Sequence, residues 1–391
     1  MMRLPYFNPC AAPHDPCAMN GIAPSQGAER KPLNFFRKKK FNVIVTDMRM
    51  PGMDGAQLLT EVRKIRPETI RIILSGQAED KAFLRAVGSM HQFLSKPCDF
   101  NILKKAIANS LSLKEYLRNE NLKKLLTKTD TLPTLPELYL ELLEELQSEN
   151  STLERIGEIV SKDIGMTAKI LQVANSAFFG MSNKISSPTQ AVEVLGLDFI
   201  QALVITYQAF KTNSPQAPLK LIWDHSVETA GFAILLARRE KMGTQIEINS
   251  FTASMLHDIG KVIFMIHFKE KFEQCLTLAK KTKKYDWEIE QEIFEADHAQ
   301  VGAYLIGLWG LPDQVIEAIA YHEYPSRSQS NIFSPLTLLY VSNFLIEENP
   351  RGYRIGKPQE LDEEYLKSIG ISDRIPEWRK LYAETKNQEE S

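Results

Sequence analysis

Three short apolar runs rich in β-branched residues occupy the first quarter of the chain, and stretches with helical spacing of apolar residues separate them. Such alternation predicts an α/β unit with buried parallel strands in a doubly wound sheet, whose site lies at the carboxyl ends of the strands. After residue 110 no strand-like alternation recurs, so the rest of the chain is predicted to be all-α. The three runs are residues 41–47, 71–75 and 92–95.

Polar side chains stand where these runs end. Asp47 closes the first run, Ser75 closes the second, and Lys96 follows the third. Because the carboxyl ends of parallel strands meet at one edge, we expect these side chains to lie together. An aspartate can accept a phosphoryl group there, a hydroxyl can bind its oxygens, and a lysine can neutralise them.

Together with the Met-Pro-Gly-Met-Asp-Gly loop at 50–55, these residues resemble the receiver domain of two-component response regulators. The resemblance implies that Asp47 is the phosphoacceptor and that Ser75 and Phe93 are the switch residues. It also implies that Lys96 is the lysine of the family's lysine–proline pair. A sensor histidine kinase or a phosphotransfer protein is the implied partner.

The resemblance is incomplete at its start. Receivers begin with a strand that ends in two acids, which hold Mg²⁺ together with the phosphoacceptor. Residues 1–33 are rich in proline and contain no such strand. They are predicted to be disordered. We therefore expect a truncated receiver over 34–112, lacking its first two strands as an altered gene start would produce. Mg²⁺ binding should be weakened, because Mg²⁺ prefers octahedral oxygen ligands and Asp47 stands alone. Asp47 is then either a working phosphorylation site or part of a vestigial fold element.

A helix is predicted over 101–126, with residues 113–131 linking to the next domain. Its apolar spacing is compatible with a short coiled coil that forms a homodimer, and equally with packing onto its own chain. The Leu-Pro-Thr-Leu-Pro stretch at 132–136 marks a boundary. An all-α domain is expected over 132–345, followed by a helical extension over 346–391.

Five of the seven histidines fall in this all-α part, and four of them form the candidate set, His225, His257, His298 and His322. We predict that residues 223–226 open a helix, and that His257 and Asp258 lie on a helix starting near Phe251. Buried histidines are commonly hydrogen-bonded core residues, so the cluster alone does not establish chemistry.

Several motifs spread over residues 132–345 resemble the HDOD domain, a relative of HD-type metal phosphohydrolases and HD-GYP phosphodiesterases. The motifs are Leu132-Pro133, Leu135-Pro136, Asp163, Asn175-Ser176, Leu195-Gly196, Trp223, His225-Ser226, His257 to Lys261, Asp297-His298, Trp309 to Pro312 and Tyr321-His322.

This resemblance implies metal ligands at His225, His257, Asp258 and position 343, with second-metal ligands at His298 and His322. Lys261 would contact a phosphate. Imidazoles with carboxylates suit Fe, Mn or Zn, and such an ion would lower the pKa of a bound water that attacks a phosphate ester.

Three departures weaken the enzymatic interpretation. Position 343 is Asn343, a neutral amide, Glu323 replaces the second histidine of the HD-GYP pair, and the Gly-Tyr-Pro segment is absent. HDOD domains are generally taken to be non-catalytic, and no residue is assigned as catalytic. The first hypothesis is a bacterial phosphorelay protein whose HDOD output binds a downstream protein or a nucleotide messenger. The alternative is a metal-dependent phosphohydrolase or cyclic-dinucleotide phosphodiesterase.

Composition narrows the class of partner. A formal charge of −2 gives no electrostatic case for nucleic acid or an anionic membrane, and no basic helix-turn-helix pattern stands out. No apolar run approaches the roughly 18 residues of a spanning helix, and the N-terminus lacks a signal-peptide pattern. Four cysteines without a CxxC motif fit a reducing compartment, so we expect a cytoplasmic location.

Overall fold

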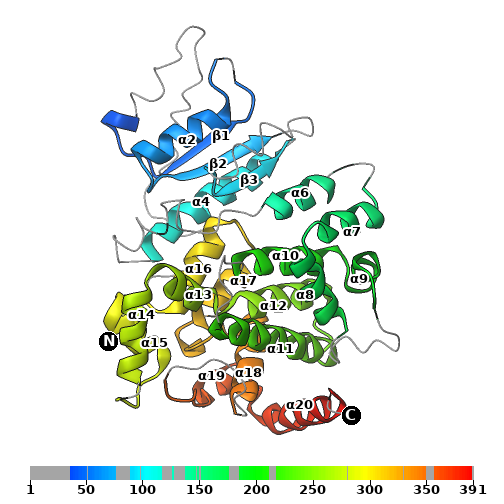
Figure 1. The fold of residues 1–391 in the computed structure, drawn as a ribbon. Helices are drawn as coiled ribbons and strands as arrows, with labels where there is room; N and C mark the ends of the chain where they lie inside the picture. The colour runs from blue at the N-terminus through cyan, green and yellow to red at the C-terminus, as the bar shows by residue number, and fades with distance from the viewer. Residues whose placement is uncertain are drawn as a thin grey trace. The chain divides into compact units, whose positions relative to one another are not determined.

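The structure is a computed structural model, and the chain divides into two compact units (Figure 1). The first comprises residues 1–137 with 307–310, and the second comprises residues 138–306 with 311–391. The described residues are 36–50, 52–75, 89–96, 98–116, 126, 137–146, 148, 151–175, 185–210, 217–279, 281–328, 330–348 and 356–389.

A parallel sheet forms the centre of the first unit. Its described strands are β1 (Val43–Asp47), β2 (Ile70–Ser75) and β3 (Gln92–Ser95), in the order β1-β2-β3. The three predicted strands and their parallel pairing are confirmed. The predicted tail at 1–33 and the predicted helix at 79–87 lie outside the described residues.

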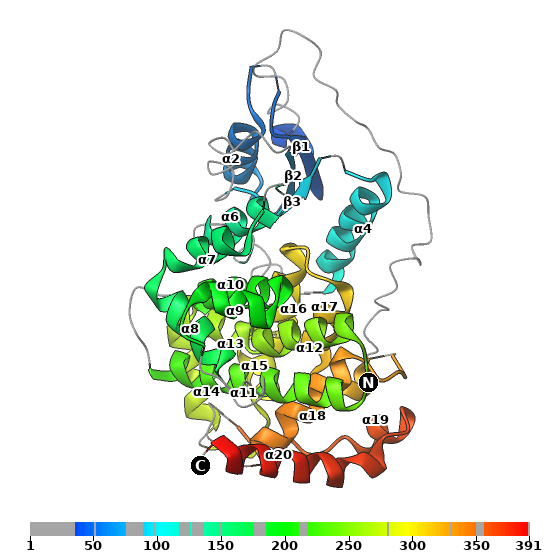
Figure 2. The ribbon, with the colours of Figure 1, turned by 90° about the vertical axis from the view of Figure 1, so that its right-hand side faces the viewer.

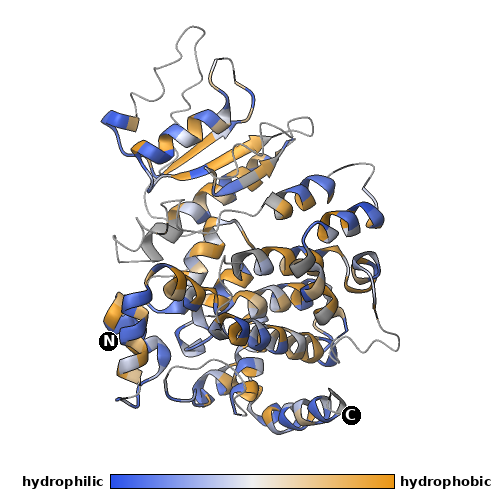
Figure 3. Ribbon diagram, in the orientation of Figure 1, coloured by the Kyte–Doolittle hydropathy of each residue, from blue (hydrophilic) through white to orange (hydrophobic). Residues whose placement is uncertain are grey.

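Helices lie on both sides of this sheet. Figure 2 shows α2 (Gly55–Ile65) and α4 (Phe100–Tyr116) on opposite faces, as a doubly wound arrangement requires. The apolar residues of α2 recur every three or four positions, so one stripe faces the sheet, where Leu58 and Val62 pack with Phe36. Figure 3 shows mostly apolar strands, and it shows both apolar and polar residues along α2. Of the predicted helix at 101–126, residues 117–125 lie outside the described part.

A capping box starts α2 directly after the loop that follows β1. Asp54 Oδ1 accepts from the Gln57 backbone N–H at 2.8 Å, and Gln57 Oε1 accepts from the Asp54 N–H at 3.2 Å. The next residue must be glycine, because a Cβ on Gly55 would lie 2.3 Å from the Asp47 carbonyl oxygen. The helix therefore begins against the end of β1 and fixes the backbone of Asp47.

The described residues of the second unit form helices and connecting loops with no strand, which confirms the predicted all-α domain. No helix in the described part of the chain is long and apolar enough to cross a bilayer. The α-helices of the second unit are α6 (Glu137–Leu146), α7 (Leu153–Ser161), α8 (Ile164–Ala174), α9 (Pro188–Leu195), α10 (Leu197–Phe210), α11 (Ala217–Arg239), α12 (Thr244–Leu256), α13 (Ile259–His267), α14 (Lys269–Ala279), α15 (Asp286–Phe294), α16 (His298–Leu308), α17 (Asp313–Tyr321), α18 (Pro335–Glu347), α19 (Glu363–Ser368) and α20 (Ile375–Glu389).

Helix α12 is the central element of this unit. It packs against α10, α11, α17 and α18, and its last eight residues, Asn249 to Leu256, are all buried. A helix that is buried around its whole circumference shows no single apolar stripe, which matches its mixed sequence. The carboxyl end of α12 consequently delivers His257 into the interior.

Two predicted helix starts were wrong. Helix α11 begins at Ala217, so residues 223–226 lie within it, because Leu219 and Ile222 extend the buried apolar pattern toward the N-terminus. Helix α12 begins at Thr244 after Gly243, which has φ +85°. It ends at Leu256, so His257 and Asp258 form the turn between α12 and α13.

The C-terminal segment packs on the same unit. Trp378 of α20 is 1% exposed and donates from its indole to Glu240 Oε1 at 3.0 Å, while the Tyr382 ring lies 5.1 Å from that of Phe232. The Tyr365 and Thr337 hydroxyls are 2.7 Å apart. Residues 356–389 therefore contribute to the core of the helical unit.

Replacing Asp54 with alanine should destabilise the first unit by about 1 kcal/mol, because the α2 amino terminus loses its side-chain acceptor. Asp54→Asn should retain most of the stability, since an amide oxygen can accept the same hydrogen bond. Urea unfolding of the full chain, followed by hydrogen exchange in β1 and α2, measures the difference. Equal losses in both variants would contradict the capping role.

Candidate functional site

Asp47 and Lys96 form an ion pair at the carboxyl edge of the sheet. Asp47 ends β1 and Lys96 follows β3, so the strands flanking β2 bring the two side chains together. Asp47 Oδ1 also lies 3.2 Å from the Arg49 backbone N–H, which donates to it. The side chains of Asp47 and Lys96 are 39% and 37% exposed, so both are accessible from solvent.

The other predicted receiver residues stand at the expected places in the backbone. Ser75 is the last residue of β2 and Phe93 lies in β3, but their side chains are outside what the structure describes. Among the described residues, no group of three metal-ligating side chains includes Asp47. The described side chains around Asp47 therefore do not fit the oxygen set that Mg²⁺ prefers.

The second unit gathers all four predicted histidines in its interior. His225 comes from α11, His257 from the end of α12, His298 from the start of α16, and His322 from the end of α17. Consecutive ring centroids are 5.2 Å apart for His225–His257, 5.0 Å for His257–His322 and 5.2 Å for His298–His322. Each histidine is at most 7% exposed.

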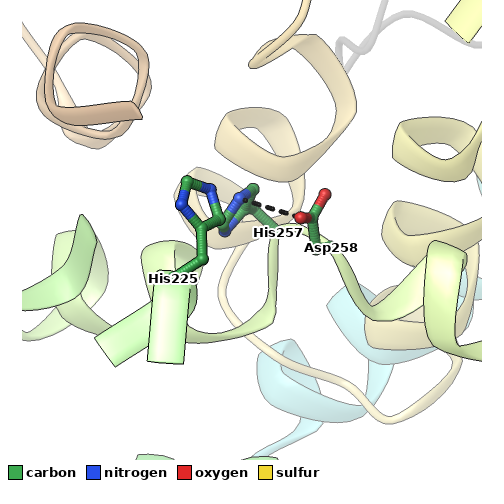
Figure 4. A group of neighbouring side chains, drawn as sticks. All are labelled: His225, His257 and Asp258. Carbon is green, nitrogen blue, oxygen red and sulfur yellow. Dashed lines mark ion pairs between the residues drawn. The ribbon is translucent and has the colours of Figure 1, made fainter. Parts of the chain in front are cut away.

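Asp258 connects two overlapping groups of candidate ligands. The first group is His225, His257 and Asp258, and the second is Asp258, His298 and His322, with ligand atoms within 4.8 Å of one another in each. Figure 4 shows the first group, with the two imidazoles side by side and Asp258 directed at His257. His257 Nε2 lies 3.5 Å from Asp258 Oδ2. The structure brings the predicted ligands together, and their metal binding stays a prediction.

Helix ends set the tautomers of two imidazoles. His257 Nδ1 donates to the Ser254 carbonyl at 2.7 Å, and His322 Nδ1 donates to the Ile319 carbonyl at 2.8 Å. Both histidines follow the last residue of a helix, where carbonyl groups three residues earlier lack intrahelical partners. A carbonyl can only accept, so Nδ1 carries the proton and Nε2 presents a lone pair to the cluster.

His298 is held by a carboxylate that the sequence reading missed. Glu290 Oε2 accepts from both the backbone N–H and Nδ1 of His298, each at 2.7 Å. Glu290 is fully buried. The sequence did contain an indication that Glu290 is buried. Asp286, Glu290 and Phe294 are spaced by four, so they lie on one face of α15.

The predicted phosphate contact, Lys261, is buried and faces carboxylates. Its Nζ lies 2.9 Å from Asp258 Oδ1 and 3.7 Å from Asp286 Oδ2, and the residue is 3% exposed. The phosphate role of Lys261 stays a prediction. Asn343 is also buried, on α18.

Burial lowers the pKa of His257 to about 3 and that of His322 to about 4, so both rings are neutral at pH 7. Burial also opposes charge on His298, but the Glu290 carboxylate outweighs it and holds the His298 pKa well above its usual value. Burial likewise opposes charge on Asp258, whereas Lys261 holds the Asp258 pKa well below its usual value. The neutral rings of His257 and His322 therefore lie near an ionised carboxylate, whereas the raised pKa of His298 favours its protonated form.

The donor set fits a transition-metal ion. His257 Nε2 is a buried nitrogen with no hydrogen-bond partner among the described residues, although its lone pair faces the cluster. Such an atom is costly to leave unsatisfied, and a cation would satisfy it. Imidazole nitrogens with a carboxylate are the ligands that Fe, Mn and Zn accept.

Comparison with known proteins identifies both units. A response regulator receiver domain matches residues 25–108, and an HDOD domain matches residues 132–325. The chain is a receiver domain followed by an HDOD domain. It is accordingly a signalling protein, as the sequence motifs predicted.

Relatives share parts of this arrangement. An uncharacterized protein of Treponema pallidum is 26% identical over 249 residues, covering 60% of this chain and 48% of that protein. The transcriptional regulatory protein GlrR of Escherichia coli is 30% identical over 126 residues, covering 32% of this chain and 26% of GlrR. The chain thus spans less than half of either relative. The crystal structure of an HDOD domain protein from Geobacter sulfurreducens superposes with a TM-score of 0.50 at 23% identity, covering 65% of this chain and 93% of that one, which supports the fold.

Glu290→Ala should destabilise the HDOD domain by about 3 kcal/mol, because two buried donors of His298 lose their acceptor. Glu290→Gln should cost less, since its amide oxygen can still accept from both. Urea unfolding of each variant, monitored by tryptophan fluorescence, measures the two losses. The proposed hold on His298 would be refuted if the glutamine variant were as unstable as the alanine variant.

Proposed function

We propose that this protein is a cytoplasmic phosphorelay component whose receiver accepts a phosphoryl group on Asp47. The donor is a sensor histidine kinase or a phosphotransfer protein. The HDOD domain acts as a binding module that passes the signal to a downstream protein or a nucleotide messenger. The observation that carries the proposal is the exposed Asp47–Lys96 pair at the carboxyl edge of the sheet.

Phosphoryl transfer to Asp47 would use the Lys96 ammonium and one backbone N–H of the same edge. A carboxylate oxygen of Asp47 attacks the phosphorus of the donor's phosphohistidine or acyl phosphate, forming an O–P bond while the donor's P–N or P–O bond breaks. The Lys96 ammonium already contacts the carboxylate, so it can neutralise the incoming phosphoryl oxygens. The Arg49 backbone N–H, 3.2 Å from Asp47 Oδ1, supplies a further donor at this edge.

Phosphorylation would change the charge at the end of β1. The phosphoryl group replaces the Asp47 carboxylate as the partner of Lys96 and adds negative charge beside the loop that leads into α2. Helix α4 contacts β1 and continues toward the predicted linker at 113–131. We propose that altered packing of this helix carries the signal to the HDOD domain.

Incubation of the full chain with radiolabelled acetyl phosphate, or with a phosphorylated histidine kinase, should label wild type through an acid-stable, hydroxylamine-sensitive acyl phosphate. Asp47→Asn should abolish the label, and Lys96→Ala should reduce it about tenfold or more because the phosphoryl charge is no longer neutralised. Asp54→Asn, a neighbouring carboxylate that caps α2, is the matched control and should label normally. Absence of label on wild type, or its persistence in Asp47→Asn, would refute the proposal.

A second candidate function rests on the histidine cluster. The inward Nε2 atoms of His257 and His322, with Asp258 between the two ligand groups, are arranged to hold Fe, Mn or Zn. When bound, such an ion supplies a Lewis acid and lowers the pKa of a coordinated water, the chemistry of a phosphohydrolase or cyclic-dinucleotide phosphodiesterase. His225, His257 and Asp258 would form one side of the site, and His298 and His322 the other. The neutral Asn343 gives the first side one anionic ligand fewer.

Metal analysis of the purified full chain, paired with hydrolysis assays on a cyclic dinucleotide and on bis(p-nitrophenyl) phosphate, separates the two functions. The binding-module proposal expects hydrolysis no faster than that of a His257→Ala variant, whether or not metal is present. Metal that is lost in His257→Ala, together with turnover that is lost with it, would establish the enzymatic function instead.

A further inference from the structure

An exposed arginine, Arg327, is stacked on two aromatic rings of the helical unit. Its guanidinium carbon lies 4.2 Å from the ring centroid of Tyr324 and 4.8 Å from that of Trp287. The two rings themselves meet edge to face, with centroids 5.3 Å apart. Among the described residues, no carboxylate pairs with this guanidinium and no acceptor bonds to it. Because stacking contacts the plane of a guanidinium, its N–H edge stays open to a ligand.

The backbone around Arg327 is held from two sides. The Ser326 backbone N–H and hydroxyl both donate to Asp362 Oδ2, at 3.2 Å and 2.5 Å. The Tyr324 hydroxyl donates to Asp297 Oδ2 at 2.7 Å, so the ring under the guanidinium is fixed to the interior. A side chain that is already held in place loses little conformational freedom when it binds, and this favours binding.

Cations without acidic partners lie close by in the sequence. The loop at 281–284 leads directly into α15, which carries Trp287 in its first turn. Lys281 and Lys283 are exposed and form no ion pair in the described part of the chain. Lys284 pairs with a glutamate of α15. The exposed cations beside the stacked rings therefore call for an acidic partner.

The residue types are those of a protein-binding surface. Trp, Tyr and Arg are enriched among the few residues that carry most of the energy of a protein–protein interface. Here Tyr285 and Trp287 lie in nearly parallel planes with centroids 6.0 Å apart, and both are partly exposed. Nucleic acid fits less well, because Arg327 already covers a face of Trp287 and of Tyr324 on which a base would stack.

The cation–aromatic surface comprises Tyr285, Trp287, Tyr324, Arg327, Lys281 and Lys283. We propose that this surface docks an acidic segment of a downstream protein, with Arg327 as its anchor. A carboxylate of the partner takes the open edge of the guanidinium through two parallel N–H···O bonds, and the lysines attract further acids. The inference rests on the proposed binding-module role of the HDOD domain, and it states the chemistry of the partner.

Fluorescence anisotropy of a short fluorescein-labelled poly-glutamate peptide, titrated with the full chain, tests the proposal. Arg327→Gln should weaken binding at least about tenfold because the anchor is lost. Arg327→Lys should weaken it less, since an ammonium keeps the charge and loses the fork. Arg155→Gln is the matched control: it removes an exposed arginine that already pairs with Glu158, and it should bind within about twofold of wild type.

Hydrogen exchange locates the bound peptide, and circular dichroism reports whether each variant keeps its helices. Exchange at 281–288 and 323–328 should slow in wild type when the peptide binds, and should not slow in Arg327→Gln. No binding, equal binding by wild type and Arg327→Gln, or protection of neither segment would overturn the proposal. Tighter, Arg327-dependent binding of a poly-uridylate oligonucleotide of equal charge would overturn the protein partner in favour of nucleic acid.

Phosphoryl labelling separates this inference from the proposed function. Arg327→Gln should be labelled on Asp47 like wild type, because the substitution lies outside the receiver. A chain that binds the peptide through Arg327 and takes no label would refute the phosphoryl-accepting role alone. A labelled chain that does not bind the peptide would refute the docking surface alone.

Discussion

The ionised Asp258 carboxylate in the interior of the helical unit is the constraint around which the candidate metal centre is arranged. A buried charge must be matched by partners, and Asp258 has Lys261 at 2.9 Å, His257 at 3.5 Å and His298 at 3.5 Å. Its position in the turn between α12 and α13 lets one residue face both ligand groups. Helices α11, α12, α16 and α17 must therefore converge on this turn. The close approach is visible at Gly260, where any Cβ would lie 2.0 Å from the His298 carbonyl oxygen.

The receiver is arranged differently, since the carboxylate proposed to accept the phosphoryl group is exposed at the edge of a short sheet. Backbone geometry fixes Asp47 from two directions: β1 pairs with β2, and the start of α2 lies against the Asp47 carbonyl. Lys96 arrives from β3. An exposed ion pair contributes little to stability, so the Asp47–Lys96 pair adds little to the stability of this unit.

Periodicity and strand-end chemistry predicted a large part of this architecture. The three strands, their parallel pairing and the convergence of Asp47 with Lys96 follow from short β-branched runs whose ends carry polar residues. The helical unit and its four histidines were also predictable. Helix starts were not, because α12 mixes polar and apolar residues on its buried faces and carries no stripe that marks its beginning. Helix α11 also extends upstream of the polar residues that resembled a cap. Glu290 was missed since a glutamate in a charged helix resembles a solvated residue until the neighbouring helix covers it. Glu323 was described only as the residue that replaces a histidine, because the sequence does not show that its Oε1 lies 3.3 Å from His298 Nε2.

Asp286 joins the cluster to the far end of the chain. This carboxylate lies 3.7 Å from Lys261 through Oδ2, while its Oδ1 accepts from the Gly356 backbone N–H, and a Cβ at Gly356 would press against the same region. The segment that begins at 356 is thus secured to the residue that balances the lysine beside Asp258. A cut or insertion between α18 and α19 would free that carboxylate to rotate, and the electrostatic balance of the interior would shift without any change to a ligand. Gly356, 34 residues beyond the last histidine of the cluster, thus shares one carboxylate with the lysine that neutralises Asp258.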